Sequence, residues 1–181
     1  MVQDKKPWLN EPDYKRWRDG ETQLMCLILR AGSTGALCGY VRVPRSLAKK
    51  MDASGRQKSL DEFGCRRPAY DSPVFWGISV HGGLTYSGGI RTLKRGRERG
   101  VWIGFDCAHF GDLTPALDEY LGGRQITREV RIYRDINYVT EQVRYLAQQI
   151  KELAKLPRAT FRWNRMCVWC ALKPSTPTPS C

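Results

Sequence analysis

Short runs of apolar residues, separated by glycine, proline and charged residues, divide most of the chain. Such runs occupy residues 23–29, 36–43, 74–80, 84–87 and 101–105, and residues 129–133 alternate between polar and apolar positions. Apolar runs of this length between turn-forming residues predict β-strands. The glycine-rich stretch 32–35 lies between the first two runs, so we expect those two strands to form a hairpin.

One long helix is predicted towards the C-terminal end. Apolar residues recur in steps of three and four from Ile136 to about residue 155, and Asp135 precedes them as an N-cap. Shorter helical turns are predicted at 115–120 and at 60–63, the latter within the irregular stretch 45–72. The pattern predicts a single-domain α+β fold, in which one long amphipathic helix packs on an antiparallel or mixed sheet of about five to six strands.

The chain divides by composition into three parts. Residues 1–22 are polar and predict an irregular N-terminal arm, which tryptophans such as Trp8 and Trp17 dock onto the domain. Residues 23–156 form the predicted globular α+β domain. Residues 157–181 are a basic, aromatic C-terminal segment that ends in a Pro/Ser/Thr tail, which we expect to be disordered.

Composition excludes several classes of protein. The 181 residues are 41% hydrophobic and 27% charged, which is typical of a globular protein. No apolar stretch approaches the roughly 20 residues that a membrane span needs, and no apolar run follows the N-terminal lysines as it would in a secretory signal. We therefore expect no membrane partner and a cytoplasmic location, which is the host cytoplasm if a phage encodes the chain.

The cysteines favour a reducing compartment. Seven cysteines are present, which is an odd number, and Cys26, Cys38 and Cys107 lie in or beside apolar runs as buried thiols would. Cys167 and Cys170 form one Cys-x-x-Cys pair with no second pair at zinc-finger spacing. Two thiols on a partly buried tail are therefore favoured over a structural zinc site.

The charge of the chain points to an anionic partner. The formal net charge is +12, and five basic residues crowd into positions 91–99: Arg91, Lys94, Arg95, Arg97 and Arg99. A basic surface attracts nucleic acids, nucleotides and acidic proteins. The alternative is a basic loop that is merely solvated.

The two histidines of the chain mark the candidate site. His81 and His109 each follow a predicted strand, and glycines lie close to both. Asp106 and Asp112 lie on either side of His109, so the three residues recur at every third position. Titratable side chains at strand ends, beside backbone that allows close approach, are typical of a functional pocket. We expect His81 and Asp106 to lie at the same edge of the sheet.

Several chemistries fit this set. His81, Asp106, His109 and Asp112 are candidate catalytic residues, as an acid–base set or as ligands of a divalent metal, and neither a metal nor a cofactor is assigned. The backbone amides of Gly82, Gly83 and Gly111 are candidates to hold a phosphate, together with the basic residues at 91–99. The structural alternative is that His81 bonds a neighbouring carbonyl and the aspartates cap loops. No spacing matches an established catalytic motif.

Four segments resemble blocks of an uncharacterised protein family encoded by bacteriophages. They are Leu-Cys-Gly-Tyr-Val at 37–41, His-Gly-Gly-Leu-Thr-Tyr at 81–86, Gly-Phe-Asp-Cys-Ala-His at 104–109 and Tyr-Arg-Asp at 133–135. The blocks cover most of the chain between about residues 23 and 150. The resemblance implies a phage accessory protein that acts in the host cytoplasm, and it implies no particular activity. The basic insert and the Cys-Val-Trp-Cys tail lie outside the shared pattern.

Three function classes follow, in order of preference. The first is a phage accessory protein that binds an anionic ligand, either a nucleotide or a nucleic acid, and counteracts host defence. The second is a small metal-assisted or His/Asp phosphoester hydrolase. The third is an inhibitor that binds a host defence protein through its basic surface.

Overall fold

The structure is a computed structural model and describes residues 6–48, 75, 77–92, 96–97, 100–122 and 130–157. Its elements, in chain order, are η1 (Pro7–Asn10), β1 (Tyr14–Arg18), β2 (Met25–Arg30), β3 (Leu37–Arg42), β4 (Tyr86–Gly88), β5 (Arg91–Thr92), β6 (Gly96–Arg97), β7 (Trp102–Asp106), β8 (Asp112–Leu113), α2 (Pro115–Tyr120), β9 (Ile132–Tyr133) and α4 (Ile136–Lys155).

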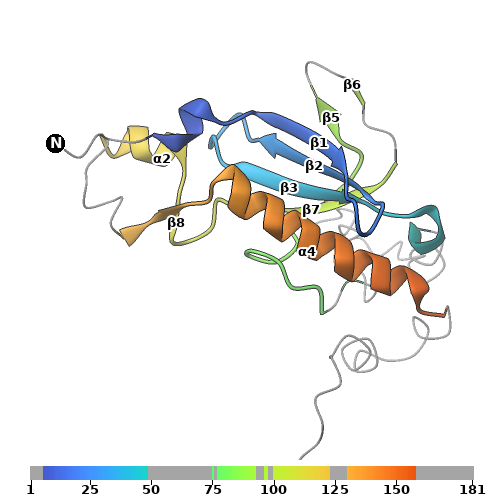
Figure 1. Cartoon of the computed structure of the whole chain (residues 1–181). Coiled ribbons are helices and arrows are strands. Elements are labelled where there is room, and N and C mark those ends of the chain that lie inside the picture. The colour runs from blue at the N-terminus through green and yellow to red at the C-terminus, as the bar shows by residue number, and fades with distance from the viewer. Residues whose placement is uncertain are drawn as a thin grey trace, which may run out of the picture.

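The described residues form a two-layer α+β fold. Five strands make one sheet in the order β1-β2-β3-β7-β4, and every neighbouring pair is antiparallel. Figure 1 shows α4 lying along one face of this sheet. The predicted fold class and the predicted β2–β3 hairpin are therefore confirmed. Two further pairs lie outside the main sheet: the hairpin β5–β6 and the parallel pair β8–β9.

Strand alternation places the main core between the sheet and α4. Val41 pairs with Ile103, and Gly39 pairs with Phe105, so these side chains share the face that α4 covers. Val41, Ile103 and Phe105 are each at most 1% exposed, and they join the buried stripe of α4 in one cluster. A Cβ on Gly39 would lie 2.5 Å from Val143 of α4, so this glycine lets the helix approach the sheet closely.

The other face of the sheet carries a second, smaller cluster. Leu27, Ile90 and Trp102 are buried there, and tyrosines pack around them. In Figure 1 the hairpin β5–β6 lies on this side, away from α4. The two faces of the sheet therefore differ: one is covered by a long helix and the other by a small aromatic cluster.

Two predicted segments differ from the structure. Residues 14–18 fall in the predicted irregular arm but form the edge strand β1, whose Lys15 donates a hydrogen bond to Thr140 of α4. Residues 78–80 fall in a predicted strand but pair with no strand. There the backbone of Ser79 exchanges hydrogen bonds with the side chain of Gln149 on α4, at 2.8 Å in each direction. A side-chain amide thus replaces the strand partner that the apolar run predicted.

The start of α4 is held by two carboxylates. Asp135 is the N-cap and accepts a hydrogen bond from the Tyr138 amide, as predicted, while Glu11 accepts one from the Ile136 amide. Glu11 also accepts from the Tyr133 hydroxyl, and the Trp8 ring packs edge-on against Tyr133 at 5.0 Å. The N-terminal segment is therefore docked at Trp8, as predicted, and it fixes the entrance of α4.

Several predictions concern residues that the structure does not describe. They are the helical turn at 60–63, the disordered tail within 158–181 and the Cys167–Cys170 pair. Cys26, Cys38 and Cys107 are free and buried, as predicted. None of the described helices is long and apolar enough to span a membrane.

Candidate functional site

Asp112 is hydrogen-bonded to both histidine segments. Its side chain is 1% exposed, and both carboxylate oxygens are hydrogen-bonded. Oδ2 accepts from His81 Nε2 at 2.8 Å and from the His109 amide at 3.0 Å, while Oδ1 accepts from Arg134 Nε at 2.9 Å. Burial by itself raises the pKa of Asp112, but the hydrogen bonds from His81, Arg134 and the His109 amide outweigh it, so the pKa lies below its ordinary value.

Tyr138 of α4 contacts two of the residues that bind Asp112, namely His81 and Arg134. Its hydroxyl lies 3.0 Å from His81 Nδ1, and the guanidinium of Arg134 lies 4.9 Å from the centre of its ring. We call His81, Asp112, Arg134 and Tyr138 the Asp112 network. With the His81 Nε2 proton directed at Asp112, Nδ1 of the neutral ring accepts the Tyr138 hydroxyl proton. Both ring nitrogens of His81 are therefore used within the protein.

These contacts give His81 and Asp112 a positioning role. A general base or a metal ligand needs a free nitrogen or oxygen facing the substrate or metal, and in the described structure these atoms already face protein donors and acceptors. Among the described residues, no group of three or more His, Cys, Asp or Glu side chains is arranged to hold a metal ion. The catalytic roles predicted for His81 and Asp112 stay predictions that these contacts do not favour.

His109 lies directly over the backbone of Gly82. A Cβ on Gly82 would fall 1.9 Å from His109 Nε2, and Gly82 has a φ of +63°, so glycine is required there on both counts. The centres of the two imidazole rings are 5.5 Å apart. The structure therefore confirms that the two histidine segments meet in one place.

Asp106 is the accessible carboxylate of the cluster. Its Oδ2 accepts the Thr85 hydroxyl at 2.7 Å and its Oδ1 accepts the Ala108 amide at 3.1 Å. His109 Nε2 lies 3.8 Å from Asp106 Oδ1, and the two side chains are about one-third exposed, at 32% and 34%. Nε2 itself is buried and has no hydrogen-bond partner among the described residues. Of the four predicted catalytic residues, this pair is the one with access to solvent.

The segment His109–Asp112 is a rigid turn, which we call the Phe110 turn. The Asp112 amide donates to the His109 carbonyl at 3.0 Å, and Gly111 has a φ of +92°, as the third residue of a type II turn requires. The Ile132 amide donates to the Gly111 carbonyl at 3.0 Å, which ties the turn to β9. Together with the bonds to the Asp112 carboxylate, these contacts hold the turn from both sides.

Phe110 stands at the tip of this turn with its side chain wholly in solvent. Its exposed fraction is 100%, and the guanidinium of Arg131 lies 5.8 Å from the centre of its ring. Val130 and Ile132 beside it are also exposed, at 71% and 58%. Phe110 was not among the predicted site residues, although a large apolar residue between His109 and Gly111 in a polar loop is a visible signal.

The remaining predicted ligand residues are only partly brought to this place. The Gly83 amide donates to the Val80 carbonyl at 3.0 Å, so that amide is used within the turn and is not directed at a ligand. Arg91 and Arg97 pair in the hairpin β5–β6, which Figure 1 shows on the side of the sheet away from α4. Lys94, Arg95 and Arg99 lie outside the described residues.

A separate cavity lies at the other end of the sheet. Its volume is about 470 Å³. Its lining comes from the start of β2, the end of β3 and Gly100, which precedes β7. Because Gly100 precedes β7 and Asp106 ends it, the cavity and the histidine cluster are at opposite ends of that strand. The predicted site and the described cavity are therefore different places.

Comparisons of the chain with protein-family models, with curated proteins and with solved structures found no match. The resemblance to a bacteriophage family therefore stays a prediction.

Proposed function

We propose that the protein binds single-stranded nucleic acid, or a nucleotide, by stacking a base on Phe110. The observation that supports this proposal is the wholly exposed ring at the tip of a turn that a buried carboxylate holds in place. An aromatic ring in water forfeits about 1.5–3 kcal/mol that burial would supply, and a base that stacks on it recovers part of this energy. The proposal specifies the anionic ligand expected from the sequence.

Rigidity of the turn favours a binding role for Phe110. A side chain on a loose loop loses conformational entropy when a ligand orders it, whereas a side chain on a fixed turn loses little. The Asp112 network holds the Phe110 turn through its carboxylate, so His81 and Arg134 support the binding residue without touching the ligand. This arrangement is the usual one for a recognition residue supported by a second layer of polar contacts.

Charge favours a nucleic acid over an uncharged aromatic partner. The guanidinium of Arg131 lies 5.8 Å from the centre of the Phe110 ring, and the whole chain carries a formal net charge of +12. Aromatic rings that stack bases beside cations that meet phosphates are the common composition of single-strand binding surfaces. Action against a host defence system is a further part of this proposal, and it rests on the phage origin that the resemblance implies.

The test is the affinity of Phe110→Ala for a short fluorescent single-stranded oligonucleotide, measured by anisotropy. Loss of one stacked base costs about 1–3 kcal/mol, so we expect binding to weaken by roughly 5- to 160-fold. Tyr120→Ala is the matched control, because Tyr120 is an exposed aromatic on α2 at 85% and should leave the affinity unchanged. Equal losses in the two variants, or no binding by the wild type at low salt, would contradict the proposal.

Arg131→Gln separates the phosphate contact from the stacking contact. Removal of one phosphate contact should lower the slope of log K against log salt by about 0.7 for a single strand, whereas Phe110→Ala should leave that slope unchanged. If Phe110→Ala abolishes capture of a host protein and has no effect on oligonucleotide binding, the third function class replaces the proposal.

A second candidate activity rests on the Asp106–His109 pair. An imidazole 3.8 Å from a carboxylate, with both side chains about one-third exposed, has the composition of an acid–base pair for phosphoester hydrolysis. If the pair acts in this way, His109→Ala abolishes product formation from nucleotides, cyclic dinucleotides and short oligonucleotides while the fold is retained. Intact nucleotide recovered from the wild-type protein after denaturation would favour binding without turnover.

A further inference from the structure

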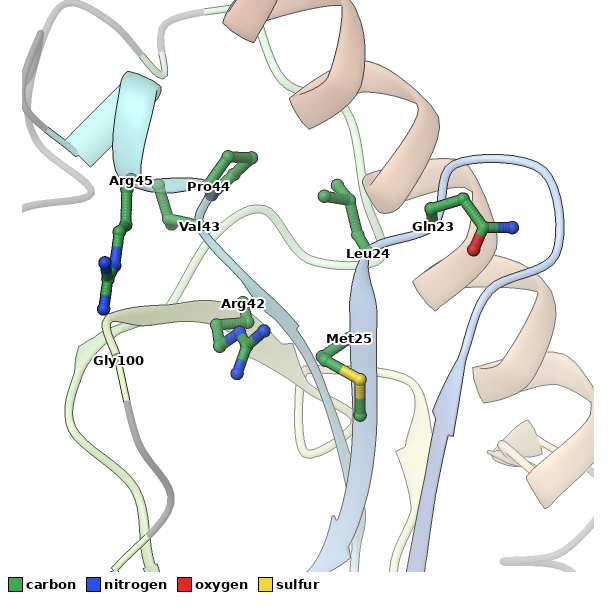
Figure 2. A pocket seen from close by; sticks show the side chains of 8 residues that line it. All are labelled: Gln23, Leu24, Met25, Arg42, Val43, Pro44, Arg45 and Gly100. Carbon is green, nitrogen blue, oxygen red and sulfur yellow. The ribbon is translucent and has the colours of Figure 1, made fainter.

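The cavity at the start of β2 is lined by two arginines and by no acidic residue among those that the structure describes. Figure 2 shows its lining, which consists of Gln23, Leu24, Met25, Arg42, Val43, Pro44, Arg45 and Gly100. We call it the arginine pocket. Its volume of about 470 Å³ lies within the range of pockets that hold small ligands, roughly 300–1,000 Å³.

Two guanidinium groups that pair with no carboxylate in the described part of the chain favour an anion in the arginine pocket. Among the described residues, neither Arg42 nor Arg45 forms an ion pair with a carboxylate, whereas Arg30 and Arg134 each do. Like charges that line one cavity repel each other, and an anion between them removes this repulsion. Phosphate is the anion that guanidinium groups bind best, because their donors match its oxygens in pairs.

Arg42 is held in place by the strand that carries it. It ends β3 and pairs with Trp102 of β7, and the Val43 amide continues the ladder by donating to the Val101 carbonyl at 2.9 Å. A Cβ on Gly100 would lie 3.0 Å from Arg42 Cδ, so the absence of a side chain at Gly100 leaves room for the stem of Arg42. The charged end of Arg42 is therefore presented by a fixed backbone.

The turn that carries Gln23 to the pocket has a fixed backbone conformation. Gln23 has a φ of +62°, and it is the single residue other than glycine with a positive φ in the described ranges. Left-handed backbone at a residue with a Cβ costs roughly 1 kcal/mol, and here it lies in the β1–β2 turn, where the Gln23 amide donates to the Asp19 carbonyl at 2.9 Å. Arg18 donates to the Gln23 carbonyl at 2.9 Å, and the Gln23 side chain donates to the Gly20 carbonyl at 2.6 Å, so this conformation is held by specific contacts.

Four further lining residues are apolar and favour a ligand that carries an apolar or planar group as well as an anion. Leu24, Met25, Val43 and Pro44 contribute side chains that cannot contact a phosphate favourably. Methionine is a common contact of flat rings, because its sulfur is polarisable and its side chain adapts to the ring. A ligand that fills the pocket therefore has a phosphate at one end and an apolar or planar group at the other.

We propose that the arginine pocket binds a phosphate monoester with a planar group attached, which is the chemistry of a nucleoside monophosphate. Arg42 and Arg45 bind the phosphate, and the planar group packs against Met25 and Pro44. Either a free nucleotide or the terminal nucleotide of a strand supplies this chemistry. The site is independent of the Phe110 turn, because the two lie at opposite ends of β7.

Calorimetric titration of the full chain with adenosine monophosphate, adenosine and inorganic phosphate tests the site. We expect the monophosphate to bind more tightly than either fragment, and Arg42→Gln or Arg45→Gln to weaken it by about tenfold or more, as loss of a charge-assisted hydrogen bond does. Arg16→Gln, on the exposed side of β1, is the matched control and should bind as the wild type does. Equal binding of adenosine and the monophosphate, or unchanged binding by both pocket variants, overturns the proposal.

Two further measurements identify the source of the ligand and distinguish the arginine pocket from the Phe110 turn. If strand ends are bound, a 5′-phosphate on an oligonucleotide raises its affinity, and Arg42→Gln removes that gain; if the gain is absent, the free nucleotide is the ligand. Phe110→Ala should leave titration with the monophosphate unchanged. Loss of monophosphate binding in Phe110→Ala, with Arg42→Gln unaffected, would assign the nucleotide to the Phe110 turn instead.

Discussion

The imidazole of His81 donates a hydrogen bond at 2.8 Å to the carboxylate of Asp112, 31 residues further along the chain. This bond joins the turn before β4 to the Phe110 turn, and Tyr138 fixes the other nitrogen of the ring from α4. A buried carboxylate with three donors holds its neighbours in one arrangement, because any other arrangement leaves the charge without partners. The relationship explains how a wholly exposed phenylalanine can be held in a fixed position.

Asp112→Asn should destabilise the protein strongly. The amide cannot replace a carboxylate that accepts from His81, Arg134 and a backbone amide at once, and breaking a buried ion pair costs about 3–5 kcal/mol. Asp13→Asn is the control, because Asp13 also pairs with an arginine, Arg30, but its side chain is 75% exposed. Such exposed pairs contribute at most about 1 kcal/mol. Urea denaturation of both variants checks this, and similar losses in the two would contradict the special role of Asp112.

The contribution of Asp112 should depend on pH in a defined direction. Its pKa is lower in the folded protein than the unfolded value of about 3.9, so the folded state favours the charged form. The stability from this shift is fully present above the unfolded pKa and is lost as the pH falls through the folded pKa. The difference in unfolding free energy between wild type and Asp112→Asn should therefore shrink below about pH 4. A difference that stays constant down to about pH 2 would show that the ionised carboxylate is not its source.

Local sequence patterns were sufficient to predict α4 and the β2–β3 hairpin. The apolar stripe of α4 and its Asp135 cap repeat within one or two turns, and the β2–β3 hairpin needs one glycine-rich connection. Residues 78–80 were predicted wrongly, because their partners are side-chain amides of α4 such as Gln149, about 70 residues away, and no local pattern encodes such a partner. β1 was missed because three of its five residues are charged and its two aromatic residues, Tyr14 and Trp17, do not alternate with polar ones.

The sequence predicted that His81 and His109 lie close together, but not the hydrogen bonds that their surroundings form. The two histidine segments were expected to meet, and the ring centres of His81 and His109 lie 5.5 Å apart. The glycines were expected to admit a ligand, whereas Gly82 admits the ring of His109. Tyr138 is hydrogen-bonded to His81 Nδ1, and Arg134 is hydrogen-bonded to Asp112 Oδ1, so these atoms are not free for a ligand. No spacing in the sequence links Tyr138 or Arg134 to His81. The arginine pocket was not predicted, because three distant segments form it and each contributes only one to four residues.

Gly39→Ala should destabilise the packing of α4 on the sheet. The added Cβ would lie 2.5 Å from Val143 and 2.6 Å from Phe105, both of which are buried, so the helix or the strand must move. Overpacking of this kind costs about 1–3 kcal/mol. Gly20→Ala is the control, because nothing lies within 4 Å of its new Cβ. Thermal unfolding compares the two variants, and an equal melting temperature would contradict the close approach of α4.

The buried thiols should be unreactive in the native protein. Burial raises the pKa of Cys26 to about 12 and that of Cys38 to about 11, and it raises the pKa of Cys107 as well. Thiolate is the reactive form, so alkylation at neutral pH should reach these three residues only after unfolding. Mass spectrometry of peptides after iodoacetamide treatment, with and without urea, measures this directly. Rapid labelling of Cys38 in the native protein would show that β3 opens to solvent.

Gly82→Ala and Gly83→Ala separate the position of His109 from backbone strain. Both glycines have left-handed backbone, with φ of +63° and +84°, so alanine costs roughly 1 kcal/mol at either position for conformational reasons. A Cβ at Gly82 would also collide with the His109 ring at 1.9 Å, whereas a Cβ at Gly83 meets nothing within 4 Å. Both variants should therefore lose stability, but only Gly82→Ala should displace His109 and disturb the Phe110 turn.

The imidazole signals of His109 in ¹H–¹⁵N spectra report this displacement, with His81 as an internal reference for the Asp112 network. We expect the His109 ring signals to shift in Gly82→Ala and to stay near their wild-type positions in Gly83→Ala. Oligonucleotide affinity should fall in the first variant and hold in the second, because Phe110 follows His109 directly in the turn. If the two alanine variants lose affinity equally, backbone strain alone accounts for the glycines, and the contact between His109 and Gly82 does not position Phe110.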